Sequence, residues 1–297
     1  MWGSEKGEKC DILPVTRGVT APGRPKGRGN RMREKGAWSR EWADMRRDMR
    51  RQEDAFLERY RQAQAPLEQL RDRVPQGVQD TLEAAFSKAF CVILEKGTPA
   101  IEKTLRKEEL KRRAALWAFD VSQKETRRAL REPGKKARAS ALRDTAFSGA
   151  QGLVLGVLGM GLPDVPLFVG EILRGVYKTA LHYGFSYEGE TEQMFVLAVI
   201  EAACSAGEAQ QERDRELNRL IETGRAPASW TKKGRREAAA AALAGQVLYL
   251  KFLQGVPVAG AVGGAYNAPV LRRVLRYADL KYRRRFLRGL RREKPKG

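Results

Sequence analysis

The sequence predicts an all-α protein with a single multi-helix domain. Two observations favour the all-α class, and a third allows a buried core. Apolar residues recur three, four or seven positions apart over long stretches, and no stretch alternates with period two for long enough to form a sheet. Hydrophobic residues make up 42% of the 297 positions, enough for a sizeable buried core. We expect a disordered basic segment over 1–36, a helical domain over 38–290 and a basic tail over 291–297.

The first 36 residues combine Gly, Pro and charge without a helical period, so they cannot bury enough apolar surface to offset the entropy of ordering. They also lack the continuous apolar stretch of a signal peptide, which favours a cytoplasmic start. Met32 is an alternative to Met1 as initiator, because the periodic sequence begins only after it. A first helical stripe then comprises Trp38, Trp42, Met45, Met49, Phe56 and Tyr60.

Further helices follow over 78–94 and 101–131, each stopped by Gly or Pro-Gly. Asp164 can cap a helix that runs to Tyr183 and stops at Gly184, and Ser186 is a candidate cap for the next one. The polar stretch 210–233 is expected to link two parts of the molecule. A strongly helical stretch resumes over 238–253.

Two apolar segments rich in glycine flank these central helices. Glycines three or four apart share one helical face and allow another backbone to approach closely, which is a reason to keep them despite a cost of about 1 kcal/mol each. Each segment approaches the ~20 residues that cross a bilayer, although Pro163 and Pro257 interrupt them. Two interpretations fit this pattern: a pair of helices buried in a soluble protein, and segments that enter a membrane. The predicted packing glycines are Gly149, Gly152, Gly156, Gly159, Gly161, Gly260, Gly263 and Gly264.

The charge balance points to a polyanionic partner. Lys and Arg number 57 against 36 Asp and Glu, a formal net charge of +21. Such a charge attracts an anionic lipid surface, nucleic acid or an acidic protein face. Three widely spaced Cys and one His exclude a disulfide framework and a His-rich zinc site, and we expect no cofactor and no metal.

The last 26 residues hold 12 Lys or Arg and only 2 acidic residues, spaced around an apolar stripe of period four. A basic amphipathic helix is a common device for lying on an anionic membrane surface. A terminal helix with solvated arginines and, with weaker support, a nucleic-acid surface are the alternatives. The predicted membrane- or anion-binding residues are Arg272, Arg273, Arg276, Lys281, Arg283, Arg284, Arg285, Arg288, Arg291 and Arg292.

The candidates for chemistry are acidic residues and the single histidine: Asp164, Glu171, His182, Glu188 and Glu192. Glu188 and Glu192 are four apart, so one helical face could present both carboxylates as an acid/base or metal pair. Helix capping and solvation explain most of these residues without chemistry. No nucleophile elbow and no phosphate loop is present, so an enzyme, such as a lipid or peptide hydrolase, is only the rival interpretation.

Five blocks of the sequence together carry a resemblance to a known family. They are GLPDVPLF over 161–168, Ile172-Leu173-Arg174, Tyr183-Gly184-Phe185, VPVAGAVGG over 256–264 and the basic stretch 272–287. In combination they resemble the EcsC family of bacterial proteins. The family is named from a protein encoded beside an ABC exporter. The resemblance implies an accessory or binding protein at the cytoplasmic membrane face, with an exporter as a possible neighbour and no established molecular activity. Ser186-Tyr187 stand where the family usually offers an aspartate, which argues against a carboxylate role there.

Overall fold

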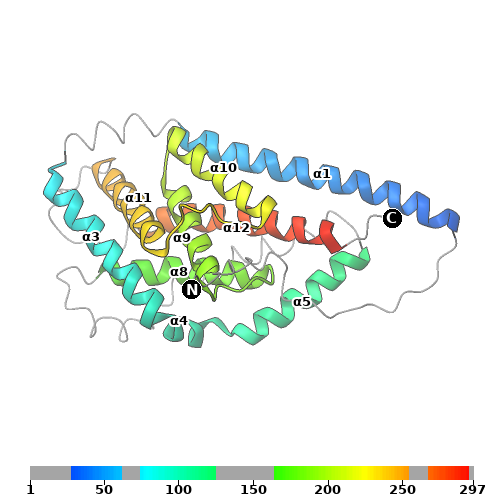
Figure 1. Ribbon diagram of the computed structural model, residues 1–297, viewed down its shortest axis with the longest axis horizontal. Helices are drawn as coiled ribbons and strands as arrows, with labels where there is room; N and C mark the ends of the chain where they lie inside the picture. Colours follow the sequence, from blue (N-terminus) through cyan, green and yellow to red (C-terminus); the bar gives the residue numbers. More distant parts are fainter. Residues whose placement is uncertain (1–27, 62–73, 125–163, 254–266, 294–297) are drawn as a thin grey trace, which may run out of the picture.

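A computed structural model describes residues 28–61, 74–124, 164–253 and 267–293 of the chain. These residues form α-helices and a few short turns, with no strand among them, which confirms the predicted all-α class (Figure 1). A single π-helical turn, Ile93–Gly97, connects α3 to α4. The helices are α1 (Arg28–Arg61), α3 (Gln76–Val92), α4 (Thr98–Leu105), α5 (Lys107–Lys124), α8 (Asp164–His182), α9 (Glu190–Cys204), α10 (Gly207–Thr223), α11 (Lys232–Leu253) and α12 (Asn267–Glu293).

Helix α9 is the centre of the hydrophobic core. Every residue from Phe195 to Cys204 is buried, so this helix is covered on all sides. It packs against α10, α11 and α12. Helix α11 presents alanines, including Ala239, Ala240 and Ala244, to α9 and α3, and these small side chains allow the helices to approach closely.

Helix α12 runs through the middle of the molecule, with α1 and α10 above it and α8 below it in the view of Figure 1. It lies antiparallel to α1. Along the α1 sequence the contacts on α12 run backwards: Asp48 faces Arg283, Glu53 faces Lys281, Phe56 faces Tyr277 and Tyr60 faces Arg273. Most described residues of α12 are buried. Its charge predicts a helix at the surface, whereas the structure packs it inside the molecule.

The predicted boundaries of α8 are confirmed to within one residue, and those of α9 are partly wrong. Gly184 adopts the left-handed backbone (φ 78°) that ends α8, as expected for a glycine after a helix. Helix α9 begins only at Glu190, preceded by Gly189 at φ 88°, so Ser186 does not cap it. The Ser186 hydroxyl instead accepts a hydrogen bond from the Glu188 amide within the connecting turn.

Two predicted irregular segments are helical. The polar stretch expected to be a linker contains most of α10, whose Leu217, Leu220 and Ile221 are buried. Most of its charged residues face outward, whereas Asp214 is buried. Residues 28–36, expected to be disordered, form the first turns of α1, because an established helix extends at low cost once it is nucleated. Residues 1–27 lie outside the described part of the chain.

No helix in the described part of the chain is long and apolar enough to cross a membrane. The predicted packing glycines Gly149, Gly152, Gly156, Gly159, Gly161, Gly260, Gly263 and Gly264 all lie outside the described residues.

Candidate functional site

The carboxylates predicted as an acid/base or metal pair are not brought together. Glu188 lies before α9 and pairs with Lys107 of α5, whereas Glu192 lies in α9 and pairs with Arg285 of α12. The helical spacing inferred from the sequence is therefore wrong, because the helix begins at Glu190 and Glu188 is not part of it.

The other candidates for chemistry lie apart on α8. Glu171 and His182 are eleven residues apart, about 16 Å along a helix, too far to share one ion. Burial raises the pKa of the Glu171 carboxyl. Burial, reinforced by Lys178 and Arg113, lowers the pKa of His182 to about 4, so its imidazole is neutral at pH 7. Asp164 begins α8, but its side chain is outside the described set, and the described residues contain no grouping of acidic, His and Cys side chains fit for a metal ion.

Half of the cations predicted to face a membrane are instead ion-paired inside the helical bundle. The expectation that they lie on open faces of α12 is wrong for these residues, because acidic side chains of α1, α9 and α10 neutralise them. The pairs are Lys281 with Glu53 and Asp214, Arg283 with Asp48, Arg284 with Glu53 and Glu222, Arg285 with Glu192, and Arg288 with Glu222.

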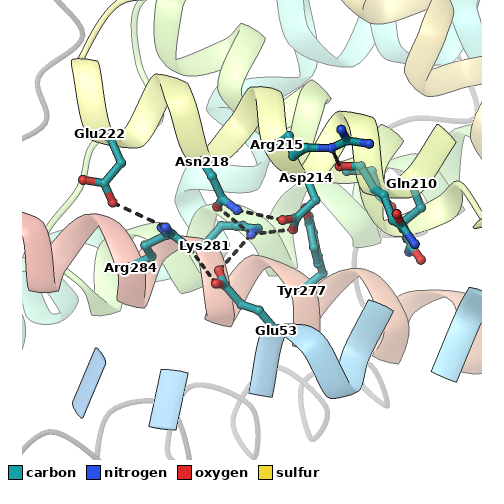
Figure 2. Close-up of polar contacts among 11 residues, drawn as sticks. Glu53, Gln210, Asp214, Arg215, Asn218, Glu222, Tyr277, Lys281 and Arg284 are labelled. Carbon is teal, nitrogen blue, oxygen red and sulfur yellow. Dashed lines mark hydrogen bonds and ion pairs between the residues drawn. The ribbon is translucent and has the colours of Figure 1, made fainter. Parts of the chain in front are cut away.

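Lys281 is the centre of the densest of these clusters (Figure 2). Its ammonium is fully buried and lies 2.8 Å from Glu53, 2.6 Å from Asp214 and 2.9 Å from the Asn218 amide oxygen. The Tyr277 hydroxyl donates to Asp214 at 2.8 Å. Glu222 adds a third carboxylate, which pairs with Arg284 and Arg288. Three carboxylates therefore match three cations, and this cluster of α1, α10 and α12 is internally neutral.

The opposite end of α12 differs, because its arginines line a pocket. The pocket has a volume of about 440 Å³ and lies between the end of α1 and the first turns of α12. Arg59 and Tyr60 come from α1, and Arg272, Arg273 and Arg276 come from α12. No carboxylate forms an ion pair with any of these four arginines among the residues that the structure describes. We call these five residues and their cavity the arginine pocket.

Arg273 forms the inner wall of the arginine pocket. Only 5% of the residue is exposed, and its guanidinium donates hydrogen bonds to the Gln246 side chain and to the Ser205 carbonyl at the end of α9. The Tyr60 ring covers it, with the guanidinium carbon 3.8 Å from the ring centroid. Its Nε has no hydrogen-bond partner among the described groups, and burial lowers the pKa of the guanidinium. A buried cation is thus held by neutral groups alone.

Of the ten cations predicted from the sequence, Arg272, Arg273 and Arg276 meet in the arginine pocket. The side chains of Arg291 and Arg292 lie outside the described set. Sequence reasoning missed Arg59, since nothing local to α1 indicates that its end meets the start of α12. The apolar period of α1 did place Tyr60 on the packing face, and the antiparallel contact brings its neighbour Arg59 to the pocket.

The comparisons with known proteins agree with the blocks found in the sequence. The model of the EcsC protein family matches residues 38–287, which include every residue of the arginine pocket and of the Lys281 cluster. No curated protein and no solved structure matches the chain. Since the match covers most of its length, the chain belongs to the EcsC protein family.

Proposed function

We propose that this protein is an accessory or binding protein at the cytoplasmic membrane face, where it docks on anionic lipid through the arginine pocket. An ABC exporter is a possible neighbour there. The observation that carries the proposal is the contrast along α12: the cations from Lys281 to Arg288 have carboxylate partners, whereas Arg272, Arg273 and Arg276 have none among the described residues. Uncompensated arginines attract anions that the protein itself does not supply.

The docking face is smaller than the sequence predicts. Arg59 and Arg272 are exposed, Arg276 is partly exposed, and the three surround one opening between two helices. Each basic residue near an anionic surface contributes about 1 kcal/mol, and salt screens this attraction. Docking through such a patch is therefore reversible and depends on ionic strength.

Co-sedimentation of the full chain with vesicles tests the proposal. We expect binding to vesicles that contain phosphatidylglycerol, little binding to pure phosphatidylcholine, and release by high salt. Replacing Arg272 and Arg276 together by Gln should weaken binding by at least about tenfold, since two surface charges are lost.

Lys103 and Arg112 provide the matched control, because both are exposed on α4 and α5, away from the arginine pocket. Their joint replacement by Gln removes the same charge and should reduce binding much less. Equal losses in the two double variants would show that overall charge, and not this face, drives association. Absence of vesicle binding would overturn the membrane proposal, and salt-sensitive retention of oligonucleotides instead would favour the nucleic-acid alternative.

A further inference from the structure

We infer that the arginine pocket is a specific binding site for a phosphate monoester, supplied by the headgroup of an anionic lipid. This inference rests on the proposed membrane function and adds selection of one headgroup chemistry to general electrostatic attraction.

Charge is the first argument. Four arginines line one cavity of about 440 Å³, within the range of pockets that hold a small ligand. Elsewhere on α12 the fully buried Lys281 and Arg285 are each matched by carboxylates at 2.6 to 2.8 Å. Arg273 is buried to a similar degree and has no such partner in the described chain. A bound anion would supply the charge that this end of the helix lacks.

Preorganisation is the second argument. A guanidinium has five N–H donors in a fixed plane. Arg273 uses its terminal nitrogens to hold Gln246 and Ser205, while the Tyr60 ring covers one face of its plane. These contacts fix the side chain before a ligand arrives, and a wall that is already ordered loses little entropy on binding. The more exposed Arg59, Arg272 and Arg276 can then close around a ligand from the rim.

The ligand chemistry follows from the number of donors. A carboxylate carries one negative charge and two oxygens, whereas a phosphate monoester carries about 1.5 to 2 charges at pH 7 and three terminal oxygens. Arginine recognises such oxygens through pairs of parallel hydrogen bonds. The arginines around this one cavity match the monoester better than a carboxylate or a singly charged diester. Pro269 and Leu275 complete the lining and give the cavity an apolar side against which a glycerol backbone can pack.

The experiment separates headgroup selection from charge. Full-length protein is sedimented with vesicles of phosphatidylcholine that contain either phosphatidic acid, a monoester, or phosphatidylglycerol, a diester, at mole fractions adjusted to equal surface charge. Glycerol 3-phosphate, titrated into the protein at low salt in a calorimeter, serves as the soluble probe. We expect binding to phosphatidic acid to be at least about tenfold tighter, the factor that one charge-assisted hydrogen bond supplies.

The key variant replaces Arg272 and Arg276 together by Lys. Lysine keeps both charges and loses the planar, bidentate guanidinium, so binding to phosphatidic acid should fall at least about tenfold, to the level of phosphatidylglycerol, whose binding should fall much less. Both positions are at the rim and outside the hydrogen-bond network of Arg273, and an unchanged unfolding midpoint confirms that the variant folds. Loss of preference with retained general binding supports the inference.

The remaining outcomes each decide the question. Equal binding to the two charge-matched vesicles, or a preference that survives in the lysine variant, overturns headgroup selection and leaves the proposed membrane function standing. Saturable binding of glycerol 3-phosphate without binding to any vesicle overturns both the lipid source and the membrane function. Absence of both kinds of binding overturns the pocket as an anion site.

Discussion

The guanidinium of Arg285 donates two hydrogen bonds, of 2.6 and 2.8 Å, to the two carboxylate oxygens of Glu192. Both side chains are almost fully buried, and the rings of Phe185 and Phe195 lie 4.4 and 4.3 Å from the guanidinium carbon. Glu192 also lies in the first turn of α9, where the positive end of the helix dipole favours a carboxylate. This pair fixes α12 to the start of the central helix.

Glu192→Gln should destabilise the protein by about 3–5 kcal/mol, because it leaves the Arg285 charge buried without its partner. Urea unfolding followed by circular dichroism measures the loss. Glu190→Gln, an exposed carboxylate in the same first turn, is the matched control and should cost less than about 1 kcal/mol. Replacing Glu192 and Arg285 together by Leu should destabilise the protein by less than the sum of the losses from Glu192→Leu and Arg285→Leu. Equal effects of the two glutamine variants would contradict this account.

The sequence predicted the helices better than it predicted the partners of their charges. The boundaries of α8 and the apolar stripe of α12 depend on residues close together in the chain, namely a glycine stop and a period of four. The burial of Lys281 depends on Glu53, which lies 228 positions away. A positive residue on a helix has the same local pattern whether it faces solvent or a distant carboxylate. Only the packing of α12 between α1, α8, α9 and α10 distinguishes the neutralised arginines from those of the pocket.

Glu53 attaches α1 to the rest of the molecule, since it contacts both Lys281 and Arg284. Glu53→Gln should therefore cost several kcal/mol, on the order of 3, and should weaken α1 more than the core. Hydrogen exchange measured by mass spectrometry tests this: amides of α1 should exchange faster than in the wild type, while those of α9 keep their protection.

Asp54→Asn is the control for this prediction, because it makes the same chemical change at the next residue, which is exposed. We expect its α1 amides to exchange at the wild-type rate. Indistinguishable α1 exchange in the two variants would show that the ion pairs of Glu53 do not hold the helix.

The single histidine predicts a pH dependence of stability. The pKa of His182 is lowered to about 4 by burial and by the positive charges of Lys178 and Arg113, against about 6.5 in the unfolded chain. Between these two values the unfolded state binds more protons than the folded state. The contribution of His182 to the free energy of unfolding is therefore fully present above pH 6.5 and is lost as the pH falls toward 4. At pH 5 the loss should be at most about 2 kcal/mol relative to pH 7.

His182→Gln removes this titration and isolates the contribution. Glu171 and Glu201, whose pKa values burial raises, shift stability in the opposite direction, but they remain in both proteins. The difference in unfolding free energy between wild type and variant, measured at pH 7 and pH 5, therefore reports on His182 alone. A difference that is the same at both pH values would refute the assignment.

Gly175 of α8 packs directly against Leu275 of α12, where there is no room for a side chain. A Cβ built there would lie 2.6 Å from Cδ2 of Leu275, so Gly175→Ala requires Leu275 to move or the two helices to separate. We expect a loss of about 1–3 kcal/mol from this overpacking, although alanine itself favours the helix.

Gly170→Ala is the control on the same helix, because its Cβ would meet only Cδ1 of Ile93 at an ordinary 3.9 Å. Thermal unfolding should show the Gly170 variant as stable as the wild type or up to about 1 kcal/mol more stable. Leu275→Ala, added to Gly175→Ala, should cost less than it does alone, because the smaller side chain removes the clash. If the effects of the two substitutions simply add, the contact between Gly175 and Leu275 does not set the spacing of α8 and α12.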